Sequence, residues 1–153
     1  MIRHIEKFLK SYNLIAENSV FAVGFSGGYD SMTLLDILNN LSKTYHFKLI
    51  ALHLNHNWRG EESEAEAQNC AQFCAEKGIE FYTETLDVNE KHTETHAREL
   101  RYQFFNNAIK KLGITALFTA HTQSDTAETL VYRMIKGTGI KGLQGISPKL
   151  SKI

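Results

Sequence analysis

Residues 21–31 read Phe21-Ala22-Val23-Gly24-Phe25-Ser26-Gly27-Gly28-Tyr29-Asp30-Ser31: an apolar segment, a turn of small residues and a polar start to a helix. The apolar run that begins at Val20 predicts a buried strand. Because glycine lacks a Cβ atom, Gly27 and Gly28 let the backbone approach a ligand closely. The helix that follows directs its unpaired N–H groups and its positive end at the same point. The segment therefore predicts an anion site, suited to phosphate, between a strand and a helix.

Asp30 places a negative charge beside this anion site. A carboxylate repels phosphate oxygens unless a divalent cation lies between them, and Mg²⁺ commonly joins one or two carboxylates to substrate phosphates. We therefore predict that Asp30 binds Mg²⁺. The segment lacks the Gly-Lys-Ser/Thr signature of the common kinase and GTPase loop, and it lacks the G-x-G-x-x-G signature of dinucleotide-binding folds. An ordinary turn between a strand and a helix is the alternative.

Strand and helix patterns alternate along the chain. The patterns predict helices over 2–12, 31–41, 61–77, 93–112 and 124–136, and strands over 20–25, 48–55, 80–86 and 116–120. This alternation predicts an α/β fold, a doubly wound parallel sheet with helices on both faces. We expect the strand order 3-2-1-4. The turn at Ser26 then lies at the switch point of the sheet, where ligands bind.

The composition narrows the classes of protein that the chain can represent. Its 153 residues predict one domain, and 17 Lys and Arg balance 17 Asp and Glu. A net charge of zero offers no overall attraction for nucleic acid. The apolar runs are too short to span a membrane, and the N-terminus resembles neither a signal nor a transit peptide. We therefore expect a cytoplasmic protein. Cys70 and Cys74 lie four apart in a predicted helix, and we expect buried thiols there.

Polar segments follow the other predicted strands and should meet the Ser26 turn at one edge of the sheet. His121 ends a strand, and Asp125 and Glu128 lie three apart in the predicted helix after it. Their carboxylates would share one face, which can receive an ammonium group or a metal ion. The alternative is an acidic first turn that complements the helix dipole.

Basic residues occur in two further segments. Arg98 and Arg101 lie three apart on a predicted helix and can clamp phosphates, although arginines on a solvated helix are common. After the second strand, Arg59 can contact phosphate and Trp58 can stack on a base. An ordinary surface turn explains this second segment equally well.

Taken in order, these motifs resemble the tRNA(Ile)-lysidine synthase family and its N-terminal PP-loop ATP pyrophosphatase domain. The resemblance rests on Ser26-Gly27-Gly28-Tyr29-Asp30-Ser31-Met32, His56-Asn57-Trp58-Arg59, Ala97-Arg98-Glu99-Leu100-Arg101-Tyr102, Ala120-His121 through Glu128-Thr129, and Lys136-Gly137-Thr138-Gly139. It implies an adenine nucleotide alpha hydrolase-like fold. It also implies that residues 1–147 are the PP-loop ATP-binding catalytic domain and that residues 148–153 begin a C-terminal region absent from this chain.

The resemblance further implies a reaction and its participants. The protein would join L-lysine to the wobble cytidine of tRNA(Ile) with a CAU anticodon, through an adenylated cytidine, while ATP becomes AMP and pyrophosphate. ATP and Mg²⁺ would be the cofactors, with Asp30 and His121 as catalytic residues and Asp30 as the metal ligand. Asp125 and Glu128 would hold the lysine. The implied ATP-binding residues are Ser26, Gly27, Gly28, Ser31, Arg98 and Arg101.

Several positions depart from the family pattern. Tyr29 stands where Pro is frequent, Thr122 replaces a frequent second His, Ser124 a frequent Asp or Asn, and Thr126 a frequent Gln. Two other functions stay open: another PP-loop tRNA-modifying enzyme, such as a tRNA thiolase, and a nucleotide-binding fragment without full activity. The sequence also leaves open whether the protein forms a homodimer.

Overall fold

The computed structural model describes the backbone of residues 2–87, 93–123 and 126–133, and the side chains among these up to residue 120. Within this part the elements follow one another as α1 (Ile2–Ser11), β1 (Val20–Gly24), α2 (Tyr29–Tyr45), β2 (Lys48–Asn55), α3 (Glu61–Lys77), β3 (Glu80–Thr85), α4 (Glu94–Leu112), β4 (Ala116–Gln123) and β5 (Thr126–Arg133). The alternation of strands and helices that the sequence predicted is therefore present through β4.

The sheet has the strand order β3-β2-β1-β4-β5, which confirms the predicted order 3-2-1-4. Strands β1 to β4 pair in parallel, and β1 lies in the middle, where Gly24 pairs with Leu52 on one side and with Thr119 on the other. The chain goes from β1 to β2 on one side and reaches β4 on the opposite side. The C-terminal end of β1 is therefore the switch point of the sheet.

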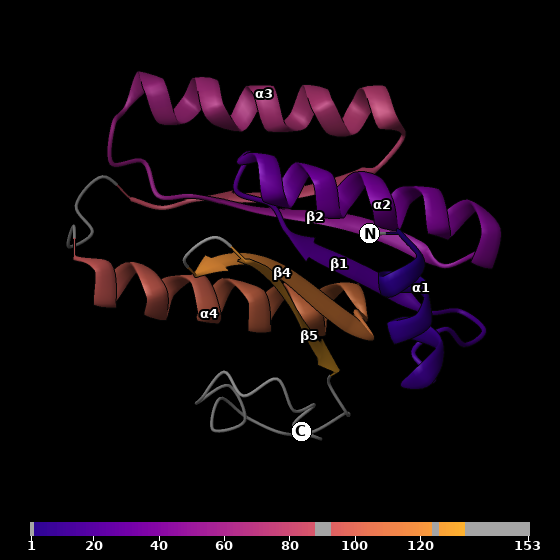
Figure 1. Ribbon diagram of the computed structural model, residues 1–153. Helices are drawn as coiled ribbons and strands as arrows, with labels where there is room; N and C mark the ends of the chain where they lie inside the picture. The colour runs from indigo at the N-terminus through magenta and orange to yellow at the C-terminus, as the bar shows by residue number, and fades with distance from the viewer. Residues whose placement is uncertain (1, 88–92, 124–125, 134–153) are drawn as a thin grey trace.

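Helices cover both faces of the sheet, as Figure 1 shows: α1, α2 and α3 lie on one face, and α4 lies on the other. The side chains of β1 divide between these layers, because successive residues of a strand point to opposite faces. Phe21 and Val23 join the core beneath α1, α2 and α3, and Ala22 joins the core beneath α4. The predicted doubly wound arrangement is confirmed.

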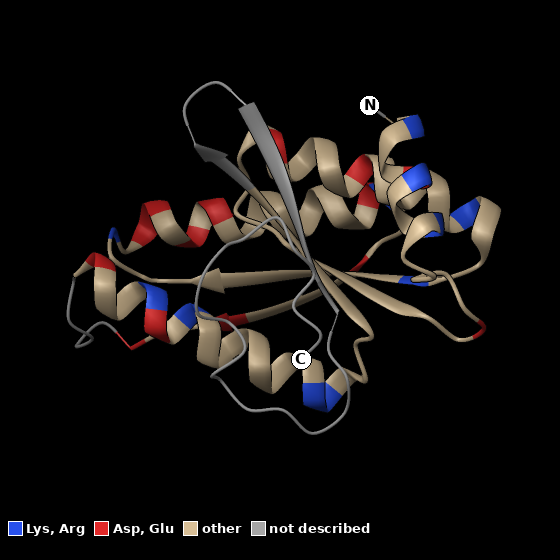
Figure 2. Ribbon diagram, turned by 60° about the horizontal axis from the view of Figure 1, so that its bottom comes forward, with Lys and Arg blue, Asp and Glu red and all other residues tan. Residues whose placement is uncertain are grey.

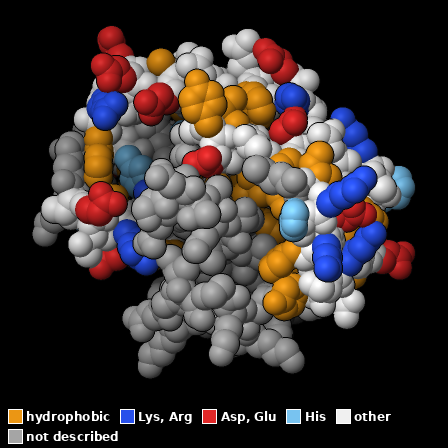
Figure 3. Space-filling model, viewed as in Figure 1, with side chains coloured by type: hydrophobic (Ala, Val, Ile, Leu, Met, Phe, Trp, Pro, Cys, Tyr) orange, Lys and Arg blue, Asp and Glu red, His pale blue; other side chains and the backbone are white. Residues whose placement is uncertain are grey.

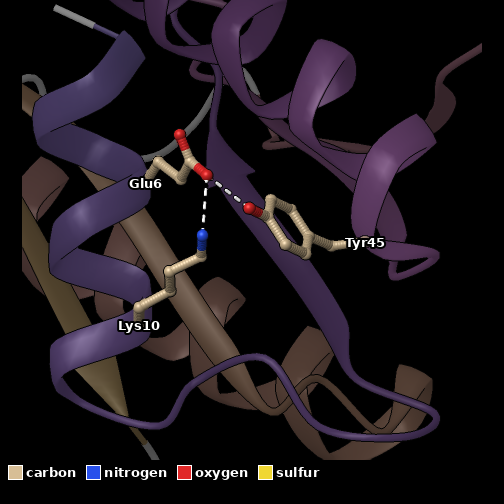
Figure 4. A network of polar contacts seen from close by, with 3 residues as sticks. All are labelled: Glu6, Lys10 and Tyr45. Atoms are coloured by element: carbon tan, nitrogen blue, oxygen red, sulfur yellow. Dashed lines mark hydrogen bonds and ion pairs between the residues drawn. The ribbon is translucent and has the colours of Figure 1, made fainter.

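A polar contact joins α1 to the C-terminal end of α2 (Figure 4). The carboxylate of Glu6 accepts hydrogen bonds from Lys10 Nζ at 2.9 Å and from the Tyr45 hydroxyl. The bond from Lys10 lowers the pKa of Glu6, and the bond from Tyr45 lowers it further. Figure 2 shows basic residues on α1 and acidic residues at the start of α3. Among the described helices, none is long and apolar enough to cross a membrane.

The predicted helix over 124–136 is wrong for the described part of this segment. Residues Thr126–Arg133 form strand β5, which pairs antiparallel with β4 from Ala116↔Arg133 to Gln123↔Thr126. The segment contains Thr126, Thr129, Val131 and Tyr132, and β-branched and aromatic residues favour strands. Pairing with β4 satisfies their backbone groups without a helix. Residues 124–125 and 134–136 lie outside the described part.

Candidate nucleotide-binding site

The phosphate turn predicted at Ser26 forms at the C-terminal end of β1. The chain leaves β1 at Gly24 and enters α2 at Tyr29. Gly27 has a φ of +81°, a left-handed conformation that glycine adopts without strain. The first helical hydrogen bond of α2 runs from Met32 N to Gly28 O at 3.0 Å. The N–H groups of residues 29–31 precede that bond, so they have no helical acceptor and are suited to an anion.

Two serine hydroxyls brace this turn from within. The Ser31 hydroxyl donates to Gly28 O at 2.9 Å, and the Ser26 and Ser31 hydroxyls lie 3.2 Å apart. A hydroxyl has one proton to donate, so Ser26 is the donor toward Ser31. Gly28 N in turn donates to the Ser26 hydroxyl at 3.4 Å. Ser31 is only 4% exposed, so its hydroxyl supports the turn from beneath, whereas Ser26 lies at the surface.

Helix α3 packs against the underside of the turn. A Cβ atom added at Gly27 would lie 3.0 Å from Cys70 Sγ, so the turn and α3 are in close contact there. Cys70 and Cys74 are both buried and reduced, which confirms the prediction of buried thiols. Burial raises the pKa of Cys70 to about 11 and that of Cys74 to about 12. Both side chains are therefore neutral packing residues at pH 7.

Asp30 lies in the first turn of α2 with its carboxylate exposed. Among the residues that the structure describes, no three metal-binding side chains gather into a site of their own. Mg²⁺ bound with ATP does not need one, because it takes one or two carboxylates and completes its shell with phosphate oxygens and water. The single carboxylate of Asp30, beside N–H groups suited to phosphate, fits that mode of binding.

The sequence analysis missed His53, a buried residue next to the turn. His53 is 6% exposed, and its Nδ1 lies 2.8 Å from the carbonyl oxygen of Phe25. Its ring stacks on Phe81 of β3 with centroids 6.0 Å apart. The sequence signal that could have revealed His53 is a polar residue at a position where the strand pattern expects an apolar one. Leu49 and Ala51, at the preceding alternate positions of β2, are apolar and buried.

Asn55 follows His53 on the same side of β2 and is also buried, at 3% exposure. Its Oδ1 accepts a hydrogen bond from Asn57 N at 2.8 Å, which shapes the turn after the strand. Its Nδ2 has no hydrogen-bond partner among the described residues. The end of β2 therefore has polar groups where the earlier part of the strand has apolar ones.

The loop after β2 meets the first turns of α4. The ring of His56 packs on Trp58, with centroids 5.5 Å apart. Burial lowers the pKa of His56 below its usual value, and the nearby positive charge of Arg101 lowers it further. Arg98 instead is exposed and donates to the Tyr102 hydroxyl at 3.3 Å. The two arginines, predicted to share a face, thus have different surroundings.

Two further predicted site residues lie opposite each other on neighbouring strands. His121 of β4 pairs with Glu128 of β5 in the antiparallel register. The helical face that Asp125 and Glu128 were predicted to share is wrong for Glu128, because residue 128 belongs to a strand. The physical reason is that pairing along the edge of β4 replaces the helical hydrogen bonds. Asp125 lies outside the described residues.

Charges of both signs lie on the side of the molecule where β2 ends and α3 begins. Figure 3 shows acidic and basic side chains mixed on this left side, whereas basic side chains gather on the right, over α1. Arg59, in the loop between β2 and α3, is exposed, and its guanidinium group lies 3.9 Å from the Glu62 carboxylate. This balance agrees with the net charge of zero.

The chain matches a known protein family. The family model of the PP-loop domain matches residues 1–153 of the chain. The chain belongs to the PP-loop domain family. Membership implies that the chain binds ATP, and the turn between β1 and α2 is the part of the structure suited to its phosphates.

Relatives of this PP-loop domain carry a more specific name. The chain is 37% identical over 152 residues to a tRNA(Ile)-lysidine synthase of Petrotoga mobilis, an alignment that covers 95% of this chain and 49% of that protein. It is also 37% identical to the synthase of Clostridium tetani, again over 95% of this chain but 32% of that protein. The chain therefore spans half or less of the length of these relatives.

A solved structure supports the fold. The chain matches a U34-tRNA thiolase of Methanococcus maripaludis, solved with its [4Fe-4S] cluster, with a TM-score of 0.62 and 22% identity. The match covers 77% of this chain and 44% of the thiolase chain. At this identity the likeness concerns the fold of the PP-loop domain and not the reaction.

Proposed function

We propose that this PP-loop domain uses ATP to join L-lysine to the wobble cytidine of tRNA(Ile) with a CAU anticodon. The observation that carries the proposal is the braced turn Ser26–Ser31 at the switch point of the sheet, in a chain 37% identical over 95% of its length to a tRNA(Ile)-lysidine synthase. ATP, Mg²⁺, lysine and the tRNA are the participants of this proposal.

In this proposal the turn binds the phosphates of ATP. Backbone N–H groups of residues 29–31 donate to the phosphate oxygens, supported by the positive end of α2. The close packing of Gly27 on α3 supports this role, because it fixes the backbone before ATP arrives. Asp30 would hold Mg²⁺, which offsets the negative charge of the phosphates. Arg101, and Arg98 with it, would contact phosphate or RNA.

The chemistry proceeds in two steps. The oxygen on C2 of the cytosine attacks the α-phosphorus of ATP, so a C–O–P linkage forms and pyrophosphate leaves. The ε-amine of lysine then attacks C2, and the bond from C2 to oxygen breaks, so AMP leaves with that oxygen. His121 would assist the first step, and Asp125 and Glu128 would hold the lysine. The register that sets His121 opposite Glu128 supports a shared site for the two steps.

The test is pyrophosphate release from ATP, measured with the whole protein. We expect release to require tRNA(Ile) with a CAU anticodon, and labelled lysine to enter that tRNA. Release that does not depend on this tRNA would contradict the proposal. Transfer of sulfur to the tRNA in place of lysine would favour a thiolase, and ATP binding without any turnover would favour a nucleotide-binding fragment.

A matched pair of variants in α2 tests the role of Asp30. We expect Asp30→Asn to lower Mg²⁺-dependent pyrophosphate release about 100-fold or more, since the amide removes the charge that would hold the cation. Asp36→Asn is the control, because Asp36 lies in the same helix and pairs with Lys77 at 2.7 Å. Asp36→Asn should keep the parental rate within about twofold, as removal of an exposed ion pair costs little. Equal rates for the two variants would remove Asp30 from the metal site.

A further inference from the structure

We propose that His53 is a positioning residue that sets the direction of the phosphate turn through the carbonyl group of Phe25. Nδ1 of His53 lies 2.8 Å from Phe25 O, and a carbonyl oxygen only accepts, so Nδ1 carries the proton and donates. In the neutral ring Nε2 is then the acceptor. The inference rests on the proposed function only in taking ATP as the ligand of the turn.

The first step of the argument concerns the end of the β1–β2 ladder. Phe25 N donates to Leu52 O at 2.7 Å, which continues the parallel pairing one residue beyond β1. The carbonyl of Phe25 then receives its hydrogen bond from a side chain of β2. The last residue before the turn is therefore held to β2 at both of its backbone polar groups, one by the backbone and one by His53.

The second step concerns the peptide that begins the turn. Phe25 O and Ser26 N belong to one trans peptide, in which the C=O and N–H bonds point in opposite directions. Because His53 holds the carbonyl toward β2, the N–H of Ser26 points away from β2. That peptide opens the turn, so His53 sets the direction in which the backbone runs toward the donors at the start of α2.

The third step concerns the rigidity of His53 itself. Its ring is 6% exposed and stacks on Phe81 of β3 at an interplanar angle of 27°. Phe25 is held as well, since its ring packs against Phe73 of α3 with centroids 5.7 Å apart. Both ends of the hydrogen bond are therefore anchored in the core, and the bond can transmit their position to the turn.

Two replacements of similar shape isolate this hydrogen bond. The side-chain amide nitrogen in His53→Asn would stand as many bonds from Cβ as the Nδ1 of histidine, so this variant keeps a donor for Phe25 O. The His53→Leu variant has the same branched shape and no donor. Asn39→Leu is the matched control, because Asn39 is 7% exposed and its Nδ2 donates to Lys77 O at 3.1 Å. That control removes a buried bond from a side chain to a carbonyl without touching the turn.

The experiment is titration calorimetry with ATP and with adenosine on the chain and its variants, beside thermal unfolding. We expect His53→Leu to raise the Kd for ATP about fivefold to tenfold, as expected for one lost hydrogen bond, with adenosine affinity changed less than twofold. His53→Asn should restore the Kd for ATP to within about twofold of the parental value. Asn39→Leu should lower the unfolding temperature and leave the Kd for ATP unchanged.

Several results would overturn the proposal. The first is a Kd for ATP in His53→Leu that equals the parental value. The second is an equal loss of ATP affinity in His53→Asn and His53→Leu. The third is a loss of adenosine affinity in His53→Leu as large as its loss of ATP affinity. If His53→Leu does not fold, Phe81→Leu replaces it. That variant keeps His53 but removes the stacked ring, and the same preferential loss for ATP is expected.

A second measurement separates this inference from the proposed function. If the parent chain does not bind ATP, the proposed function fails, and amide hydrogen exchange at Ser26, Gly27 and Gly28 decides the inference alone. Faster exchange in His53→Leu than in His53→Asn supports the positioning role, because the turn has lost its anchor. Equal exchange in the two variants overturns it.

Discussion

At the scale of single residues, Gly27 is constrained by two independent features. Its φ of +81° disfavours any residue with a Cβ atom, and the Cβ position lies 3.0 Å from Cys70 Sγ. The same residue lies in the turn that leads to the donors proposed for phosphate. Backbone conformation and packing thus both favour glycine at this position, and the proposed phosphate binding depends on the turn that it allows.

Gly27→Ala tests this requirement against a control that shares only the backbone strain. Gly78→Ala is that control, because Gly78 has a φ of +67° with no atom within 4 Å of its Cβ position. Both variants should lose about 1–2 kcal/mol of stability, measured by urea unfolding. Only Gly27→Ala should also weaken ATP binding, by about tenfold or more, since the turn must shift away from α3. Equal ATP affinities would show that the turn tolerates this shift.

At the scale of elements, α3 packs against the phosphate turn and supports it. Cys70 and Cys74, one turn apart on its inner face, are buried at 4% and 0% exposure. Burial raises the pKa of each thiol well above neutral, so neither is a thiolate at pH 7. The thiolate is the reactive form of cysteine, so this element is built for packing.

The accessibility of the two thiols provides a direct test of this packing role. We expect iodoacetamide to leave both cysteines unmodified in the folded chain at pH 7 and to alkylate both in guanidinium chloride, as measured by mass spectrometry. The expected difference in rate is about 100-fold or more, because reaction requires unfolding of the core. Rapid alkylation of the folded chain would indicate a reactive thiol and would favour sulfur chemistry.

At the scale of the whole molecule, His56 links stability to pH. Burial and the charge of Arg101 lower its pKa in the folded state, whereas the unfolded chain has the ordinary value of 6.5. The unfolded state therefore binds the proton more tightly, and stability increases with pH in this range. The contribution is fully present above pH 6.5 and is lost as the pH falls through the lower pKa of the folded state.

Urea unfolding at pH 7, 6 and 5 measures this link. We expect the parent chain to lose stability as the pH falls below 6.5. The contribution of His56 to this change in unfolding free energy stays below about 1.4 kcal/mol per pH unit, because the ring is only half-buried and solvent screens its charge. His56→Gln should lower that slope, whereas His4→Gln, at an exposed position of α1, is the control and should keep it. An unchanged slope in His56→Gln would show that other groups govern the pH dependence.

Much of the fold was predictable because its signals are local. The apolar run at 20–25, the two glycines after it and the alternation of later elements predict the β1–turn–α2 unit and the strand order. The segment after His121 was not predictable in the same way. Its acidic residues suggested a helix start, whereas its β-branched residues and the open edge of β4 favour β5.

Some residues of the candidate site could also be predicted from local signals, and others could not. Ser26, Gly27, Gly28 and Asp30 stand out in the sequence because short spacings reveal a phosphate turn and a charge beside it. His53 stands out only as a polar residue in an apolar strand, and its role could not be predicted because it depends on a carbonyl 28 residues away. Asn55 was missed for the same reason, because only burial reveals its unpaired Nδ2.

The sequence by itself determined the strands up to β4, the glycine turn and the family to which the chain belongs, because these follow from hydrophobic spacing and from residues adjacent in the chain. Only the tertiary structure decided that His53 holds Phe25, that Cys70 lies beneath Gly27 and that Glu128 pairs with His121. Each of these contacts joins elements that are separate in sequence. Packing of the whole sheet brings these elements together, and a local sequence pattern does not specify that packing.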